Sequence, residues 1–388
     1  MLNGTHRYFA QERVIYGKPA AEAVAAEAEA AGAGKVFITT NRSLGGRNGL
    51  AETIAKGLGA RSAGIYAGIT AHSPREAVIE GAAQARAAGA DLLVAVGGGS
   101  VIDATKLMLR CLWDNLTSTE QLDPLRGMRG VDPSRRPAGM DKAIRMLAVP
   151  TTYSAAEFTF IAGVSDSKRH VKEGYGHALF TPQTVVLDPA ATLATPLELL
   201  LSTGMKAVDH AVERLCAIET NPYSDATGGE ALRLLTNALP AIKQRPDDLA
   251  ARLDGQIGMW LSITGAASGI GIGASHAIGH TLGGSYGIPH GITSCVTLPS
   301  VLRWNVKVNA DRQKKVAGLM GKPNGDAGTL VADLVAGLGL PGRLRDVGIR
   351  KESFQAIAEH TMHDPPVRTN PRKIDGPADI VEILELAW

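Results

Sequence analysis

Short apolar runs alternate with helix-like stretches in the first 188 residues of the chain. The runs are KVFITT at 35–40, RSAGIYAGI at 61–69, DLLVAV at 91–96, RMLAVP at 145–150 and TVVLDP at 184–189. Apolar strands that alternate with helices are typical of a parallel sheet covered on both faces. Residues 1–188 are therefore predicted to form an α/β domain around a doubly wound parallel sheet.

The clearest of the intervening helices is predicted to begin in the segment HSPREAVIE. Ser73 is suited to the N-cap, Pro74 to the first turn, and Glu76 would complete a capping box with Ser73. A later polar stretch, 114–142, contains proline and glycine and is predicted to be a long loop between two strands.

After Pro189 the pattern changes to long amphipathic segments at 197–217, 223–243 and 248–282, with few strand-like runs. Apolar positions at helical spacing over such lengths indicate helices. Residues 189–388 are therefore predicted to form an all-α domain.

Composition narrows the class of protein. The 388 residues include 40 basic and 38 acidic side chains, for a net charge of +2, without a basic block. Nucleic acid and anionic membranes are therefore not expected partners. The three cysteines form no C-x-x-C pair, which fits a reducing cytoplasm, and no apolar run approaches the ~20 residues that span a bilayer. We expect a cytoplasmic protein with a small-molecule substrate.

Three glycines, Gly97, Gly98 and Gly99, separate the strand DLLVAV from a helix that opens at Ser100. Free amides at a helix start bind phosphate, and glycine lets a ligand approach the backbone. A tight strand-to-helix turn without a ligand is the alternative interpretation. The triplet alone leaves both open, because it matches neither G-x-G-x-x-G nor a Walker motif.

A second candidate is AVPTTYSAAEFT, in which Pro150 ends a strand and Thr151, Thr152 and Ser154 follow. Ligands of open parallel sheets gather at the carboxyl ends of the strands. The alternative is a helix start at which Thr152 or Ser154 acts as a cap toward Glu157.

Histidines cluster in the segment SHAIGHTLGGSYGIPHG. His276 and His280 are one helical turn apart, and His290 follows ten residues after His280. His210, in GMKAVDHAVE, lies on another predicted helix. Imidazoles in such a group bind a divalent metal, hold an anionic substrate or pass a proton. Ordinary hydrogen-bonded histidines are the alternative.

The chain resembles the iron-type alcohol dehydrogenases and maleylacetate reductases. The motifs that carry the resemblance occur in the order GGGSVIDATK, PTTYSAAEFT, GMKAVDHAVE and HAIGHTLGGSYGIPHG. The resemblance extends from ERVIYG to VLRWN at 301–305. The resemblance implies an amino-terminal nucleotide-binding α/β domain and a helical carboxyl-terminal domain, in the architecture shared with dehydroquinate synthase. It also implies cofactor and substrate in the cleft between the domains, and a homodimer.

The resemblance assigns roles to single residues. The cofactor NADH or NADPH would be held by Asn41, Gly97, Gly98, Gly99, Ser100, Asp103, Thr151, Thr152 and Lys172. In relatives an aspartate and three histidines bind a metal, and these histidines match His210, His276 and His290. His280 matches a histidine of the proton path.

The sequence departs from this pattern at Lys206, which stands at the position of the ligand aspartate, four residues before His210. A protonated lysine cannot ligate a metal and repels one. Asp209 is a poor substitute, because adjacent helical residues point about 100° apart. Maleylacetate reductases share this departure and a shortened PTTYSAAEFT segment with a tyrosine, here Tyr153. GGGSVIDATK is closer to the general alcohol dehydrogenases, so the subfamily stays open.

We therefore expect an enzyme that reduces the carbonyl of a small acidic substrate without a metal. His280, Lys206 and Tyr153 would be catalytic, and Tyr153, His210, His276 and His290 would bind substrate. Positive charge would come from Lys206 and from protonated His210, His276 or His290. The alternatives are a metal-dependent dehydrogenase of neutral alcohols that uses the three histidines as ligands, a non-redox lyase like dehydroquinate synthase, and a regulatory protein that binds the cofactor without catalysis.

The cofactor is not expected to be strictly NADH. Relatives selective for NADH carry an acidic residue after the second strand-like run, whereas TTNRSL has the neutral Asn41 followed by Arg42. An arginine at this place can meet the 2′-phosphate of NADPH.

Overall fold

The structure of the protein, a computed structural model, describes residues 5–128, 130–169 and 171–388. The chain divides into two compact units, which we call the sheet unit, Arg7–Thr195, and the helical unit, mainly Pro196–Trp388. In the described part of the chain, no helix is long and apolar enough to cross a membrane.

Six parallel strands form the sheet of the first unit, in the order β1-β8-β5-β4-β2-β3. Every residue of β2, β4, β5 and β8 is buried, which explains why these strands are continuous apolar runs. The strands are β1 (Arg13–Tyr16), β2 (Val36–Thr39), β3 (Ser62–Tyr66), β4 (Leu92–Gly97), β5 (Arg145–Pro150) and β8 (Thr184–Leu187).

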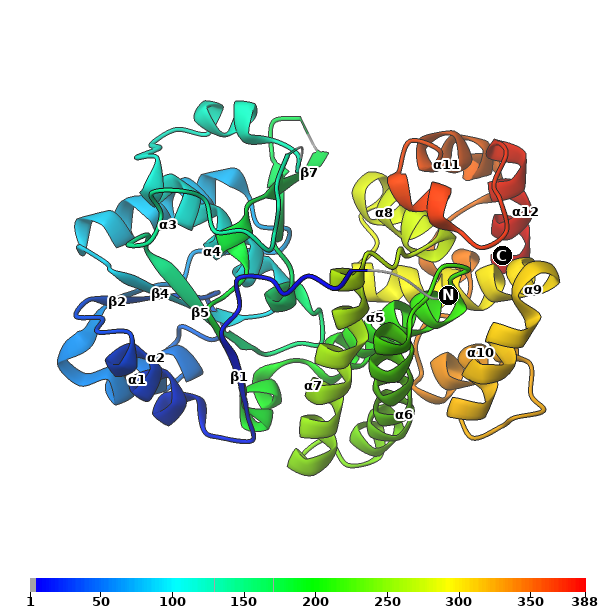
Figure 1. The fold of residues 1–388 in the computed structure, drawn as a ribbon, viewed down its shortest axis with the longest axis horizontal. Coiled ribbons are helices and arrows are strands. Elements are labelled where there is room, and N and C mark those ends of the chain that lie inside the picture. Colours follow the sequence, from blue (N-terminus) through cyan, green and yellow to red (C-terminus); the bar gives the residue numbers. More distant parts are fainter. Residues whose placement is uncertain (1–4, 129, 170) are drawn as a thin grey trace. The chain divides into compact units, whose positions relative to one another are not determined.

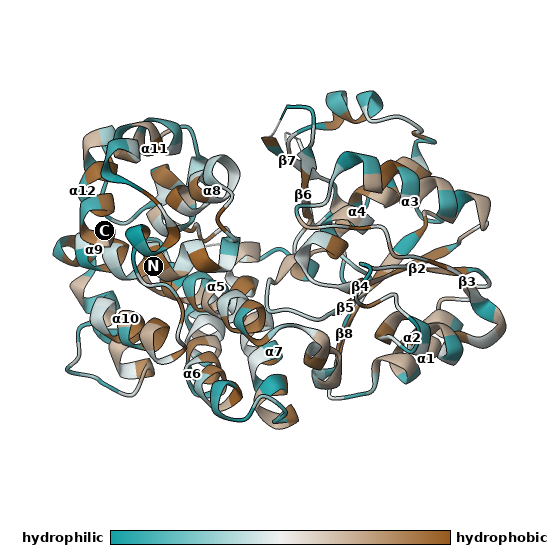
Figure 2. Cartoon of the chain, turned by 180° about the vertical axis from the view of Figure 1, so that it is seen from behind, coloured by the Kyte–Doolittle hydropathy of each residue, from teal (hydrophilic) through white to brown (hydrophobic). Residues whose placement is uncertain are grey.

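Helices cover both faces of this sheet (Figure 1). Helices α3 (Arg75–Ala87) and α4 (Gly99–Trp113) pack on one face, in a core that contains Leu93, and α1 (Ala20–Ala30) and α2 (Leu50–Leu58) pack on the other, in a core that contains Val94. Successive residues of β4 thus serve opposite cores. Figure 2 shows apolar colour on the strands between the two helix layers. The predicted doubly wound α/β domain is confirmed.

All five predicted apolar runs contain strands, and the strand in 61–69 ends at Tyr66. The pattern did not predict β1 or the antiparallel hairpin of β6 (Ile161–Asp166) and β7 (Val171–Gly176). β1 is a four-residue edge strand without a buried residue, and β7 carries the charged Lys172 and Glu173. Such strands lack the apolar signal that marks a buried strand.

An ionic cluster around Arg75 holds the hairpin against α3. The Arg75 guanidinium donates to Asp123 Oδ1 at 2.7 Å, to Tyr175 Oη at 2.6 Å and to Glu173. Asp123 belongs to the predicted loop 114–142, whose only regular element among its described residues is the short 3-10 helix Glu120–Leu125. One buried cation therefore fixes the loop, the hairpin and the start of α3 together.

The predicted capping box at the start of α3 is wrong. The helix begins at Arg75, its N-cap residue is Pro74, and no side chain caps it. The Ser73 hydroxyl instead donates to the Ser100 carbonyl at 2.7 Å, and the His72 amide donates to Ser100 Oγ at 3.1 Å. These contacts connect the segment before α3 to the first turn of α4, which local sequence did not reveal.

The second unit is helical, as predicted. Its helices are α5 (Leu197–Cys216), α6 (Pro222–Gln244), α7 (Leu249–Thr264), α8 (Ala274–Tyr286), α9 (His290–Leu319), α10 (Ala327–Gly337), α11 (Phe354–Thr361) and α12 (Pro377–Ala387). The segment 248–282 is not one helix but α7 and most of α8. The break includes the left-handed Gly269 and leaves residues 270–273 outside any helix.

Candidate active site

In the sheet unit, the glycine triplet forms the turn from β4 into α4. A Cβ atom added to Gly98 would lie 2.9 Å from Thr152 Cγ2, and one added to Gly99 would lie 3.0 Å from Ser154 Oγ. Thr152 and Ser154 thus leave no room for side chains at Gly98 and Gly99, and the backbone of the turn stays uncovered by side chains of its own. The amides of Gly99 and Ser100 open α4 without an acceptor inside the helix, so they form a place for an anion. The next two amides, those of Val101 and Ile102, donate to the Gly98 carbonyl at 3.0 and 3.2 Å.

The strands on either side of β4, β5 and β2, bring further predicted cofactor residues to the same edge. The Thr151 amide donates to the Gly97 carbonyl at 3.1 Å, and Asn41 follows β2, which pairs with β4. The chain proceeds from β2 outward to β3 and then returns to β4 on the other side of β2. The carboxyl ends of β2 and β4 therefore mark the topological switch point, the place at which open parallel sheets bind ligands.

The loop after β2 is a local turn. Asn41 Oδ1 accepts hydrogen bonds from Ser43 Oγ at 2.7 Å and from the Leu44 amide at 3.0 Å. Asn41 is half-buried and Arg42 is exposed. The turn holds Asn41 in place and leaves the Arg42 side chain at the surface.

Lys172 and Asp103 both lie next to Gly163. The Lys172 side chain crosses β6 so closely that a Cβ on Gly163 would lie 2.6 Å from Lys172 Cε, and the Gly163 amide donates to Asp103 Oδ2 at 3.1 Å. The structure thus brings together two residues that lie far apart in the sequence. Their roles toward a cofactor stay predictions.

The segment after β5 is not a capped helix start. Ala155 is left-handed, and the following 3-10 helix, Ala156–Phe158, has no side-chain cap. Lys106 of α4 holds this segment instead, because its Nζ donates to Ala156 O at 2.6 Å and to Ile161 O at 2.7 Å. Burial raises the pKa of the nearby Glu157 to about 8, so Glu157 is a buried group and not a capping partner.

Tyr153 is completely buried in the sheet unit. Its predicted contact with a substrate stays a prediction. Thr151 and Thr152 beside it are also buried, and the Thr151 carbonyl accepts from Thr195 Oγ1 at 2.7 Å.

In the helical unit, the four predicted histidines come together from three helices. The rings of His210 and His276 stack at 4.9 Å between centroids, and those of His280 and His290 stack at 5.3 Å. His276 also lies 6.2 Å from His280 and 6.3 Å from His290. The clustering that the spacing suggested is thus present in the structure.

Helix α5 supplies charged groups to this cluster. Lys206 and His210 lie one turn apart on one face, and Asp209 and Glu213 lie one turn apart on another. All four side chains are buried. Burial, and then the ammonium of Lys206, lower the pKa values of His210 and His276 well below the usual range. Both shifts favour the neutral imidazole, and the expected positive charge on the histidines stays a prediction.

Glu213 positions His276, a contact that the sequence analysis missed. Glu213 Oε2 and His276 Nδ1 form a hydrogen bond of 2.7 Å. The Glu213 carboxyl group also accepts hydrogen bonds from the amides of Gly273 and Ser275, each at 2.9 Å. The opposite nitrogen, His276 Nε2, and Nδ1 of His210 have no hydrogen-bond partner among the described residues. Both atoms are therefore available to a bound group.

A divalent metal ion fits this cluster poorly. The imidazole nitrogens are suitable ligands. However, the buried ammonium of Lys206, which the resemblance places where relatives have the ligand aspartate, acts on the same histidines. Asp209, Glu213 and His276 also lie close together. However, the 2.7 Å between Glu213 and His276 is a hydrogen bond, shorter than the ~3.3 Å that tetrahedral ligands at ~2.0 Å would have.

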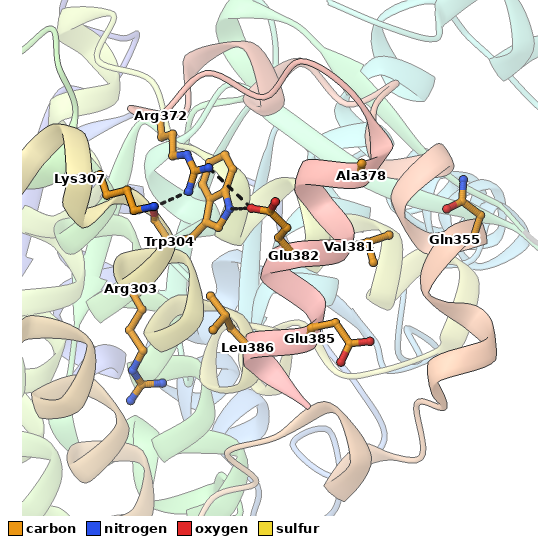
Figure 3. A pocket seen from close by; sticks show the side chains of 10 residues that line it. All are labelled: Arg303, Trp304, Lys307, Gln355, Arg372, Ala378, Val381, Glu382, Glu385 and Leu386. Atoms are coloured by element: carbon orange, nitrogen blue, oxygen red, sulfur yellow. Dashed lines mark hydrogen bonds and ion pairs between the residues drawn. The ribbon is translucent and has the colours of Figure 1, made fainter.

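A separate cavity of about 670 Å³ lies among α9, α11 and α12 (Figure 3). The Arg372 guanidinium stacks 3.7 Å from the ring centroid of Trp304, whose Nε1 donates to Glu382 at 2.8 Å. These polar groups satisfy one another. None of the predicted site residues lines this cavity.

Comparison with known proteins gives full-length matches. Residues 11–189 match the family described as iron-containing alcohol dehydrogenase, and residues 200–388 match the carboxyl-terminal part of the Fe-containing alcohol dehydrogenase family. The dehydrogenase FUM7 of Gibberella moniliformis is 33% identical over 96% of this chain and 95% of its own length. The maleylacetate reductase of Burkholderia cepacia is 30% identical over 97% and 95%. Among solved structures, maleylacetate reductase from Rhizobium sp. superposes with a TM-score of 0.82 at 28% identity, over 100% of this chain and 99% of that chain.

Proposed function

Because the chain belongs to the iron-containing alcohol dehydrogenase family and is a nicotinamide-dependent oxidoreductase, we propose that it reduces the carbonyl of a small acidic substrate. The observation that carries this proposal is the buried Lys206 among the histidines, in place of a ligand carboxylate. Maleylacetate reductases among its relatives are named for an acidic substrate. A cytoplasmic homodimer stays a prediction.

Each unit contributes one part of the proposed reaction. The glycine turn and the first amides of α4 hold the pyrophosphate of NADH or NADPH, which supplies the hydride. In the helical unit, the Lys206 ammonium stabilises negative charge on the carbonyl oxygen and attracts the substrate carboxylate. His210 Nδ1 and His276 Nε2, which have no hydrogen-bond partner among the described residues, are the nitrogens left to contact the substrate. His280 is exposed and delivers the proton.

The test is a screen of NADH and NADPH oxidation with oxo-acids and neutral aldehydes, with and without a chelator. We expect oxo-acids to be reduced at rates that the chelator leaves unchanged, because Lys206 replaces the metal's charge. Metal content measured on the same samples is the control. A stoichiometric, tightly held iron or zinc, lost together with activity on aldehydes, would favour the metal-dependent dehydrogenase. No turnover of either cofactor with any carbonyl would favour a lyase.

We also expect NADPH to be used at least as well as NADH. The exposed Arg42 follows Asn41 in the loop after β2, and residues 40–49 of this loop include no acidic side chain. Arg42→Ala should raise the KM for NADPH about 10- to 100-fold, the loss of one charge-assisted hydrogen bond, and leave the KM for NADH unchanged. Arg47→Ala, an exposed arginine in the same loop, is the matched control. A strong wild-type preference for NADH would contradict this prediction.

A further inference from the structure

His280 contacts a carboxylate from a distant part of the helical unit. Its Nδ1 lies 2.5 Å from Oδ2 of Asp364, which follows α11 and precedes the 3-10 helix Pro365–Thr369. The His280 side chain is 43% exposed, whereas that of Asp364 is 20% exposed. The Asp364 carboxylate is thus mostly covered, whereas the His280 imidazole that it contacts is partly open to solvent.

The surrounding contacts fix Asp364 relative to α8. Thr361 Oγ1 donates to Thr281 Oγ1 at 3.0 Å in a buried contact, and Ser285 Oγ lies 3.0 Å from His360 Nδ1. The Asp364 amide donates to the Thr361 carbonyl at 2.9 Å. Packing between α8 and α11 therefore fixes the backbone at Asp364 beside His280.

The pairing determines the state of the imidazole. An ionised carboxylate only accepts hydrogen bonds, so the hydrogen of the contact is on His280 Nδ1. The stacked ring of His290, inclined by 28°, restrains the same imidazole from its face. Nε2, the nitrogen on the opposite side of the ring from this contact, is then the one left to face a substrate.

We propose that Asp364 is a positioning residue that holds His280 for proton delivery to the carbonyl oxygen. The inference rests on the proposed function. As the carbonyl carbon receives hydride, the Nε2–H bond of His280 breaks and an O–H bond forms on the substrate. NAD(P)H is oxidised, the carbonyl is reduced to an alcohol, and His280 is left neutral with hydrogen on Nδ1. Water returns the proton to Nε2.

Kinetics of Asp364→Ala, Asp364→Asn and Asp364→Glu test the role. We expect Asp364→Ala to lower kcat about 10- to 100-fold with little change in KM, and to raise the solvent isotope effect on kcat because proton transfer becomes slower. Asp364→Glu should recover part of kcat. In a His280→Ala background, Asp364→Ala should have almost no further effect. Asp333→Ala, which removes an exposed carboxylate on α10, is the control.

A second measurement needs no substrate. Long-range 1H–15N spectra of the wild type, with the His280 signals assigned through His280→Gln, should show hydrogen on Nδ1, and Asp364→Ala should remove that preference. If the wild type reduces no carbonyl but the spectra behave as expected, the proposed function fails while the pairing stands. If the wild type is active and Asp364→Ala is folded with unchanged kcat and an unchanged His280 tautomer, the role of Asp364 is wrong.

Discussion

Lys206→Met is expected to lower kcat/KM for an oxo-acid about 100- to 1000-fold, the effect of removing one group that stabilises an oxyanion. Lys206 is 6% exposed, so its charge acts in surroundings that water screens weakly. Steady-state kinetics measure the loss, and Lys307→Met on α9, away from the histidines, is the matched control. Binding of NADPH, followed by titration, should not change. Unchanged reduction of the oxo-acid by folded Lys206→Met would remove Lys206 from the mechanism.

The companion variant Lys206→Asp should gain affinity for a divalent metal. The new carboxylate would lie one turn before His210, where His210 Nδ1 and His276 Nε2 have no partner among the described residues. Metal analysis after incubation with Zn²⁺ and dialysis should show retained metal in Lys206→Asp but not in the wild type. Equal retention by both proteins would mean that Lys206 does not oppose the cation.

The second large effect is expected at Gly98. Gly98→Val should weaken binding of NADPH about 10- to 100-fold or more, because the side chain occupies the space next to the first amides of α4, and charge-assisted hydrogen bonds to the phosphates are lost. Calorimetric titration measures the affinity, and thermal unfolding shows whether the protein is still folded. Unchanged affinity in a folded variant would contradict the assignment.

Gly98→Val should also lower the stability of the protein, because a Cβ on Gly98 lies only 2.9 Å from Thr152 Cγ2. Gly98→Ala combined with Thr152→Ser removes that methyl group and keeps the hydroxyl. Because Thr152 Oγ1 still lies 3.1 Å from the added Cβ, we expect the pair to recover part of the stability but not the affinity. Gly337→Ala is a control for glycine replacement, since a Cβ there meets no atom within 4 Å.

The sequence predicted the features that depend on local pattern. Buried strands such as β4 and β5 are apolar on both faces, so their runs stand out, and glycines between a strand and a helix indicate a tight turn. His276 and His280 share a helical face wherever that helix lies. For these elements, the spacing of apolar, glycine and histidine residues along the chain is enough to predict the local structure.

The failures depend on contacts between distant segments. Ser73 looked like an N-cap, but its hydroxyl bonds to the Ser100 carbonyl, which no local pattern reveals. Glu213 and Asp364 bind histidines 63 and 84 residues away. Charged residues on a helix or before a proline have many possible partners, so only the folded chain selects among them. The lowered pKa of His210 likewise follows from burial, and then from the nearby Lys206.

The position of β1 at one edge of the sheet also has a consequence for synthesis on the ribosome. Its pairing partner is β8, with Arg13 opposite Thr184. At elongation rates of about 5–20 residues per second, the partner of β1 emerges roughly 10–35 s after β1 itself. During that interval the chain can assemble β2, β3, β4 and β5, whose pairings do not involve β1. The first strand made is thus among the last to be incorporated, and a nascent chain stopped before Thr184 carries β1 without its neighbour.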